Sequence, residues 1–253
     1  MNQPKKKILF LTSEISPFSE VYQLADFSKR FSNLINDSED FEIRISQPKY
    51  GYISERKYIL REVIRLKEVP ITFNQKERVV SIKSAFIPNT RVQVYFLIDK
   101  ECFFDVNPLV YKSKNGQFKK NNFENYSLFC LSLLESFKKL FWYPDFIICN
   151  DWQSALLPGM YNKHFKDSND FYKSIKTLLV VHSYNQYAEV SREELKLANI
   201  DIHPSLKGDV LNIFEVAAFE TDSIVILDTS SNQILSDLLK LDSFKINSNN
   251  FNL

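Results

Sequence analysis

Glycine is scarce in this sequence, with only 4 residues in a chain of 253, whereas proteins average about 7% glycine. Loops that bind phosphate usually need glycine, because a side chain keeps the backbone amides away from the anion. The scarcity of glycine therefore argues against a fully equipped phosphate-binding loop.

Neither sign of charge is in excess, since 32 basic residues stand against 31 acidic ones. Such a balance gives no electrostatic reason to expect a nucleic-acid partner, and the basic run at 5–7 most simply keeps the start of the domain hydrated. No stretch reaches the roughly 18–20 apolar residues of a membrane span, and the run ILFLT at 8–12 lacks the cleavage site of a signal peptide. We expect a cytoplasmic protein with neither a membrane nor a nucleic-acid partner.

Cysteine is also sparse. Cys102, Cys130 and Cys149 are widely spaced, and the sequence has no CxxC pair and no Cys/His cluster. This pattern fits a reducing compartment and does not match the spacing of zinc ligands. We expect no metal site and no cofactor.

The patterns that are present alternate between strand-like and helix-like. Residues 7–12 form a short apolar run, apolar residues recur at three- and four-residue spacing through 21–36, and 41–46 alternates and then stops at Pro48. The chain thus opens as strand, helix, strand. Further strands are expected at 145–150, 177–182 and 223–228, and further helices at 122–141, 153–164, 209–219 and 231–240.

The middle of the chain is less regular. Runs at 59–68, 78–87 and 92–98 predict a strand-rich insertion at about 52–98, and the Asn- and Ser-rich tail from about 243 to 253 is expected to fray. Several strands are apolar on both faces, as in a parallel sheet that helices cover on both sides. The expected fold class is α/β, a doubly wound, Rossmann-like parallel sheet that forms one domain over 1–253.

Five sequence blocks then stand in an order that is more specific than any one of them. They are ILFLTSEISPFSEVYQLADF at 8–27, YFLIDKECFF at 95–104, PDFIICNDWQSALLP at 144–158, TLLVVHS at 177–183 and SLKGDVLNIFEVAAFETDSIVILDTSSNQIL at 205–235. Together they resemble the glycogen/starch synthase family of retaining glucosyltransferases, ADP-glucose type, and they cover nearly the whole chain. PKYG at 48–51 and the segment after it further resemble a short, single-domain branch of that family in Bacteroidetes-type bacteria.

The resemblance implies a fold and a reaction. Family members have two Rossmann-like domains that face each other across a cleft, the GT-B architecture, and this chain corresponds to the N-terminal one. The family transfers glucose from ADP-glucose to the end of an α-1,4-glucan, without a metal or cofactor. The second domain, which supplies most of the ADP-glucose site, is expected to be absent.

The resemblance also assigns residues. His182 and Asp151 would hold the transferred sugar, whereas the structural alternatives are a histidine satisfied at a sheet edge and a helix N-cap. Asp26 would contact substrate. Trp152 would stack on a sugar or simply pack, and Phe104 lies near an aromatic residue that contacts glucan in relatives, although phenylalanine cannot donate a hydrogen bond.

Two departures from the family pattern weaken the assignment of activity. Where the family has K-x-G-G, this chain has Glu20, Val21, Tyr22 and Gln23. The charge reversal would cost on the order of several kcal/mol beside a diphosphate in a partly desolvated cleft, and the side chains would keep the anion away. In the block NNFENY at 121–126, Asn125 replaces a family arginine.

Three interpretations stay open at this point. The chain is a glycogen/starch synthase-type glucosyltransferase domain, or a catalytically inactive glucan-binding or regulatory protein on the same fold. In the third interpretation it is one chain of a split enzyme whose protein partner supplies the C-terminal domain.

Overall fold

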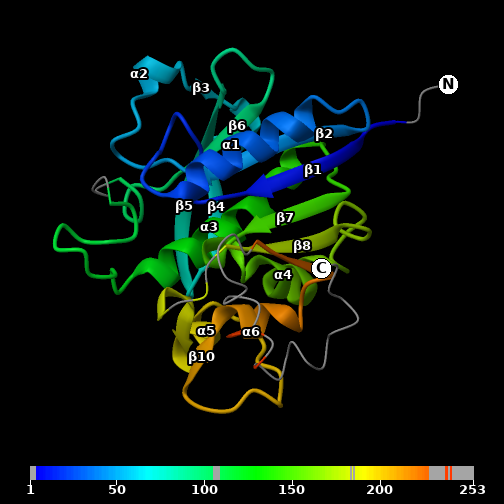
Figure 1. Cartoon of the computed structure of the whole chain (residues 1–253). Helices are drawn as coiled ribbons and strands as arrows, with labels where there is room; N and C mark the ends of the chain where they lie inside the picture. Colours follow the sequence, from blue (N-terminus) through cyan, green and yellow to red (C-terminus); the bar gives the residue numbers. More distant parts are fainter. Residues whose placement is uncertain are drawn as a thin grey trace.

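The computed structural model describes residues 4–104, 109–182, 184, 186–227, 237, 238 and 240. In this part of the chain, nine strands form one sheet in the order β11-β8-β7-β1-β2-β6-β5-β3, with β4 paired to β5 (Figure 1). The parallel strands are β1 (Lys6–Leu11), β2 (Phe41–Pro48), β6 (Gln93–Ile98), β7 (Phe146–Asn150), β8 (Lys176–Val181) and β11 (Ser223–Ile226).

The first strand lies in the middle of the sheet, and later strands are added on both sides of it. β1 pairs in parallel with β2 on one side and with β7 on the other. β2 continues to β6, whereas β7 continues through β8 to β11. The winding therefore reverses between β1 and β7, and in open α/β sheets ligands bind at the carboxyl ends of the strands at such a reversal.

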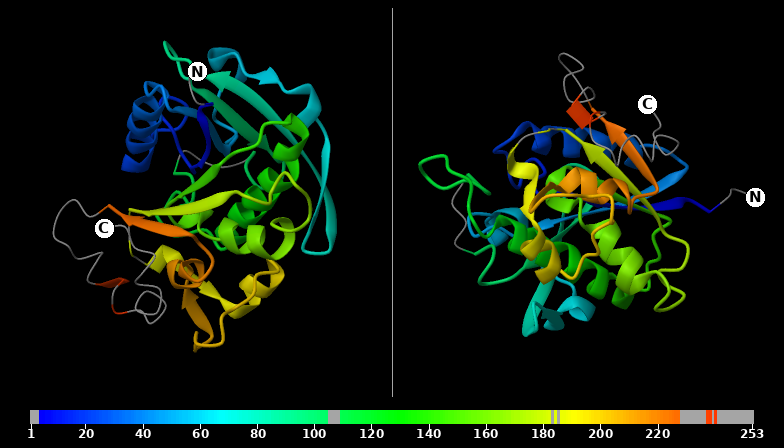
Figure 2. Two further views of the ribbon diagram at one scale, coloured as in Figure 1. Left: turned by 90° about the vertical axis from the view of Figure 1, so that its right-hand side faces the viewer. Right: turned by 90° about the horizontal axis from the view of Figure 1, so that it is seen from below.

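Helices cover both faces of the parallel strands. α1 (Gln23–Asn36) lies on one face and α3 (Asn122–Phe137) on the other (Figure 2). Strand residues such as Phe10, Leu11 and Phe96 are fully buried between these layers, which explains why the strands are apolar on both faces. The prediction of a doubly wound α/β fold is confirmed.

The predicted insertion forms an antiparallel extension of the sheet. β5 (Lys76–Phe86) runs antiparallel to β6, and β4 (Val69–Phe73) pairs with β5 as a hairpin that contacts α3. The prediction of a strand over 59–68 is wrong, because only β3 (Arg61–Glu62) pairs with β5. The short helices α2 (Glu55–Tyr58) and η1 (Ile64–Leu66) flank it.

Two predicted helices differ from the structure. The helix predicted at 153–164 is instead a 3-10 turn η3 (Trp152–Ser154), a short α4 (Leu157–Met160) and a π turn η4 (Tyr161–Phe165). The helix predicted at 209–219 begins only at α6 (Ile213–Ala218), because the preceding residues pair as strand β10 (Val210–Asn212). The remaining elements are η2 (Lys138–Leu140), η5 (Gln186–Ala188), β9 (Glu189–Ser191) and α5 (Arg192–Leu197).

Most of the helix predicted at 231–240 and all of the tail at 243–253 lie outside the described residues. The three cysteine thiols, by contrast, are all described, and each is buried and free.

Gly51, in the PKYG segment, is required by a close approach of two backbone segments. A Cβ at this position would overlap the carbonyl oxygen of Phe104, and the Gly51 amide donates to the Phe103 carbonyl oxygen at 2.9 Å. Only glycine allows this contact, which holds the loop after β2 against the loop after β6.

Candidate functional site

A cavity of about 690 Å³ opens at the carboxyl ends of β1, β7 and β8, beside the start of α1. We call it the carboxyl-end cavity. It lies where the winding of the sheet reverses, which is the position expected for a ligand. Its lining residues are Glu14, Tyr22, Gln23, Leu24, Asp26, Phe27, Arg30, Tyr111, Asp151, Gln153, His182 and Leu227.

Several residues that the sequence singled out meet in this cavity. His182 follows β8, Asp151 follows β7, and Asp26 projects from the first turn of α1. Tyr22 and Gln23, which stand where the family motif has two glycines, also line the cavity. Segments that are more than a hundred residues apart in the sequence thus form one wall.

Trp152 and Phe104 lie elsewhere. The Trp152 side chain is 4% exposed and packs edge-on against Tyr111 and Tyr126, with ring centroids 5.4 Å and 5.3 Å away. This geometry is that of a packing residue beneath the cavity wall. Phe104 is 59% exposed and does not line the cavity.

Only two residues of the loop at 20–23 line the carboxyl-end cavity, namely Tyr22 and Gln23. The exposed Glu20 carboxylate accepts a hydrogen bond from the Ser16 hydroxyl, and neither Glu20 nor Val21 lines the cavity. From the sequence, Glu20 is expected to repel a diphosphate strongly in a partly desolvated cleft. Because the Glu20 carboxylate is exposed to water, that repulsion is much weaker than expected.

Tyr22 occupies the place where the family phrase has a glycine. Its ring stacks on Tyr111, with centroids 4.6 Å apart and planes 16° apart, and its hydroxyl donates to the Leu109 carbonyl oxygen at 3.1 Å. The Lys112 ammonium lies 5.5 Å from the Tyr22 ring centroid and 4.8 Å from that of Tyr187, within the range of cation–π attraction. Aromatic packing therefore replaces the open backbone of a phosphate loop.

Glu14 is a functional candidate that sequence reasoning missed. Its side chain is buried, and its carboxylate accepts hydrogen bonds from the Ser19 hydroxyl at 2.6 Å, the Val21 amide at 3.0 Å and the Tyr22 amide at 3.2 Å. Burial raises the pKa of Glu14, and these hydrogen bonds oppose that rise. A carboxylate three residues after the central strand was the signal that could have revealed it.

Asp151 adopts a strained backbone conformation. Its φ of 63° and ψ of −173° lie in a region that is almost restricted to glycine. The carboxylate makes no N-cap hydrogen bond with the turn that follows, and its Oδ1 accepts from the His182 amide at 3.2 Å. The capping alternative is therefore wrong, and Asp151 instead links the ends of β7 and β8.

His182 is held between polar and aromatic neighbours. Its Nε2 lies 2.7 Å from Oδ1 of Asn150, and the Phe27 ring meets the imidazole edge-on at 4.4 Å between centroids. Burial lowers the pKa of His182 to about 4, because a charged imidazolium loses its hydration there. The ring is therefore neutral at neutral pH.

The charge of the cavity does not favour a polyanion. Glu14, Asp26 and Asp151 line it, and Arg30 is the one basic side chain among the lining residues of the described chain. Carboxylates beside aromatic rings suit a neutral, hydroxyl-rich ligand better than a diphosphate, which they would repel.

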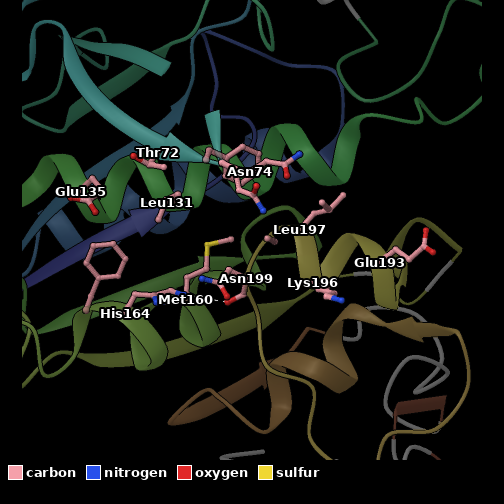
Figure 3. Close-up of a pocket in the computed structure, with 14 residues that line it drawn as sticks. Thr72, Asn74, Leu131, Glu135, Met160, His164, Glu193, Lys196, Leu197 and Asn199 are labelled. Atoms are coloured by element: carbon pink, nitrogen blue, oxygen red, sulfur yellow. Dashed lines mark hydrogen bonds between the residues drawn. The ribbon is translucent and has the colours of Figure 1, made fainter. Parts of the chain in front are cut away.

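A second and larger cavity, of about 870 Å³, lies between the β4–β5 turn, α3, η4 and α5 (Figure 3). We call it the hairpin cavity. None of the residues predicted to form the site lines it. Among its labelled residues, Leu131, Met160 and Leu197 are apolar, whereas Glu135, His164, Glu193 and Lys196 are titratable (Figure 3).

The described part of the chain contains neither a cluster of metal-ligating residues nor a helix suited to cross a membrane. No group of three or more His, Cys, Asp or Glu residues there could hold a metal ion. Among the same residues, no helix combines the length and the apolar character that a membrane crossing needs.

Comparison with known proteins places the chain in a family. Residues 7–238 match the family described as the starch synthase catalytic domain. The chain belongs to this family. Among its glycogen synthase relatives, that of Chlorobium limicola is 33% identical over 234 residues, which are 91% of this chain and 46% of the relative. The glycogen synthase of Chlorobium phaeobacteroides is 33% identical over 239 residues, 93% of this chain and 47% of the relative.

A solved structure agrees with the family assignment. The catalytic domain of starch synthase IV from Arabidopsis thaliana, bound to ADP and acarbose, superimposes with a TM-score of 0.77 at 19% identity, covering 98% of this chain and 51% of the other. The predicted family and its GT-B-type α/β fold are confirmed. The chain spans about half the length of the glycogen and starch synthases that it matches, and its placement in a short Bacteroidetes-type branch stays a prediction.

Proposed function

We propose that this chain binds the sugar of an α-glucan in the carboxyl-end cavity, as the N-terminal half of a glucosyltransferase that moves glucose from ADP-glucose to the glucan. The observation that carries the proposal is the convergence of Asp26, Asp151 and His182 on one cavity at the reversal of the sheet. The starch synthase relative of the same fold, solved with ADP and acarbose, supports it.

The chemistry expected of this half is positioning. The neutral His182 and the Asp151 carboxylate would hold sugar hydroxyls, while the aromatic wall of Tyr22, Tyr111 and Phe27 would exclude water from one side of the ring. Transfer itself needs stabilisation of the leaving diphosphate, and the cavity has only Arg30 as a basic lining residue within the described chain. The diphosphate contacts would therefore come mainly from a second domain.

A non-catalytic glucan-binding role is the second candidate, and one observation favours it. Tyr22 stacks on Tyr111 where the family phrase has an open glycine backbone, so backbone amides of this loop cannot approach a phosphate as closely. His182 and Asp151, which would hold the sugar hydroxyls, lie outside that loop, at the ends of β8 and β7. A chain that had lost donor binding would therefore keep the glucan site.

The deciding test is transfer of radiolabelled glucose from ADP-glucose, and separately from UDP-glucose, to glycogen by the purified chain. Turnover above that of His182→Ala supports transfer by this chain. Measurable glycogen binding without turnover, even after a chain with the C-terminal domain is added, supports the non-catalytic role. Absence of both, in a folded protein, overturns the proposal. The split-enzyme alternative predicts turnover only when a chain with the C-terminal domain is added.

A further inference from the structure

The Asn150 side chain, behind the wall of the carboxyl-end cavity, is the centre of a buried hydrogen-bond network. Asn150 is the last residue of β7 and is fully buried. Its Nδ2 lies 3.2 Å from the Thr12 hydroxyl and 3.2 Å from the Ser28 hydroxyl, and its Oδ1 lies 2.7 Å from His182 Nε2. β1, α1, β7 and β8 are thus joined through one amide.

Counting protons fixes the direction of the Asn150 hydrogen bonds. The Thr12 hydroxyl lies 2.9 Å from the Glu14 carbonyl oxygen, the Ser28 hydroxyl lies 2.7 Å from the Leu24 carbonyl oxygen, and the two hydroxyl oxygens lie 3.0 Å apart. Each hydroxyl has one proton, which one of these acceptors takes, so both hydroxyl oxygens accept from the Asn150 amide. The Asn150 Oδ1 is then an acceptor, and its partner, His182 Nε2, must carry a proton.

We infer that Asn150 is a positioning residue that holds His182 as the Nε2–H tautomer, so that Nδ1 meets the ligand as a hydrogen-bond acceptor. Nδ1 has no hydrogen-bond partner among the residues that the structure describes, and the ring lines the cavity. A neutral imidazole with its only proton already donated can accept from a hydroxyl but cannot donate to a phosphate oxygen.

The inference names the ligand chemistry that this position selects, and only this step rests on the proposed function. A sugar hydroxyl can donate to Nδ1, whereas a phosphate oxygen would face its lone pair. The ionisable groups around the ring agree with this selection. Asp151 accepts from the His182 amide, and Glu14, Asp26 and Arg30 line the same cavity, so an anion would meet more negative than positive groups.

The test reads the tautomer directly, by long-range proton–nitrogen correlation NMR of the full chain labelled with nitrogen-15 at histidine. The chain has only 3 histidines, so the signals of His182 are those that disappear in His182→Gln. The expected spectrum shows a protonated Nε2 and an unprotonated Nδ1 at neutral pH. A protonated Nδ1 in the wild-type chain overturns the inference.

Variants separate positioning from general stability. In Asn150→Ala we expect a mixture of the two tautomers, because no acceptor remains for Nε2–H. Asn162→Ala is the matched control, since it removes an amide that donates at 2.7 Å to the Glu220 carbonyl oxygen, away from the cavity, and it should leave the His182 signals unchanged. An Asn150→Ala spectrum that keeps a single Nε2–H tautomer contradicts the inference.

Asn150→Asp provides a second measurement if the alanine variant does not fold. A carboxylate beside Nε2–H should raise the pKa of His182 by at least about one pH unit, because the opposite charge favours the imidazolium. An unchanged pKa would mean that Asn150 does not govern the ring. These spectra need no sugar, so failure of glucan binding would refute the proposed function and leave the tautomer result standing.

Discussion

The carboxyl-end cavity and the hairpin cavity differ in how their polar side chains are held. In the hairpin cavity, Glu135 pairs with Lys138 at 2.9 Å while both side chains remain more than a third exposed, and His164 lies 3.2 Å from the Asn199 carbonyl oxygen at an exposed position. In the carboxyl-end cavity, Glu14 is buried and accepts three hydrogen bonds.

The difference between the two cavities does not follow their volumes. The hairpin cavity is the larger at about 870 Å³, against about 690 Å³ for the carboxyl-end cavity. Its titratable side chains nevertheless remain in contact with water, so folding costs little desolvation free energy for them. Buried polar groups are costly unless they are bonded. Glu14 meets this condition through its three hydrogen bonds, so its contribution to stability should exceed that of an exposed carboxylate.

The largest expected contrast is between the carboxylates of the two cavities. Glu14→Ala leaves the Ser19 hydroxyl and the amides of Val21 and Tyr22 without their acceptor, and should lower the free energy of unfolding by about 3 kcal/mol. Glu135→Ala should change it by no more than about 0.5 kcal/mol, since an exposed ion pair contributes little. Urea unfolding of both variants measures the difference, and equal losses would remove the distinction between the two cavities.

A second contrast concerns pH. Because the folded pKa of His182 is lowered to about 4 from an ordinary value of 6.5, the unfolded chain takes up a proton that the folded chain does not. Stability from this group is present above pH 6.5 and is lost as the pH falls toward 4. Between pH 7.5 and 5 the loss should be about 2 kcal/mol.

The measurement is the free energy of unfolding at several pH values for the wild-type chain and for His182→Gln. The raised pKa of Glu14 acts in the opposite direction, because stability from that group falls as the pH rises through its folded pKa. Glu14 is present in both proteins, so their difference isolates His182. Parallel pH profiles would show that His182 is not buried as a neutral ring.

Glucan affinity should distinguish the two histidines. His182→Gln is expected to weaken maltoheptaose binding about tenfold, the cost of roughly one hydrogen bond, whereas His164→Gln in the hairpin cavity should leave it unchanged. Calorimetric titration measures both. The opposite order would place the sugar in the hairpin cavity.

The smallest expected effect is the change in stability when the strained backbone of Asp151 is relieved. Asp151→Gly and Asp151→Ala both remove the carboxylate, but only glycine adopts a φ of 63° with extended ψ at little cost. The glycine variant should be the more stable by about 1 kcal/mol. At Glu135, within α3, the same comparison should reverse sign, because glycine disfavours a helix by about 1 kcal/mol. Thermal unfolding of the four variants decides whether Asp151 is strained.

Local sequence patterns predicted the parallel strands correctly, but they did not predict several segments outside those strands. The strands predicted at 7–12 and 145–150 are short apolar runs. Such runs are recognisable in a sequence because a strand that is buried on both faces is apolar at nearly every position. The segment 59–68 mixes apolar with charged residues, and only Arg61–Glu62 pairs, because strand pairing depends on partners distant in the sequence. Strand β10, predicted as helix, forms for the same reason through its pairing with β9.

The site shows the same limit. Order and spacing of the blocks identified His182 and Asp151, which the structure brings to one cavity. They could not reveal that Glu14 binds the backbone of residues seven and eight positions later, or that Asn150 joins Thr12, Ser28 and His182. Both are contacts between side chains and partners whose proximity exists only after folding.

The buried cysteines have a practical consequence. Burial raises the pKa of Cys102 to about 12 and raises those of Cys130 and Cys149 as well, so their thiols form little of the reactive thiolate. A cysteine introduced at the exposed Gln23, which lines the carboxyl-end cavity, would then be the site that a maleimide dye selects. The Gln23→Cys variant could thus report ligand binding in that cavity by fluorescence, without prior removal of the chain's own cysteines.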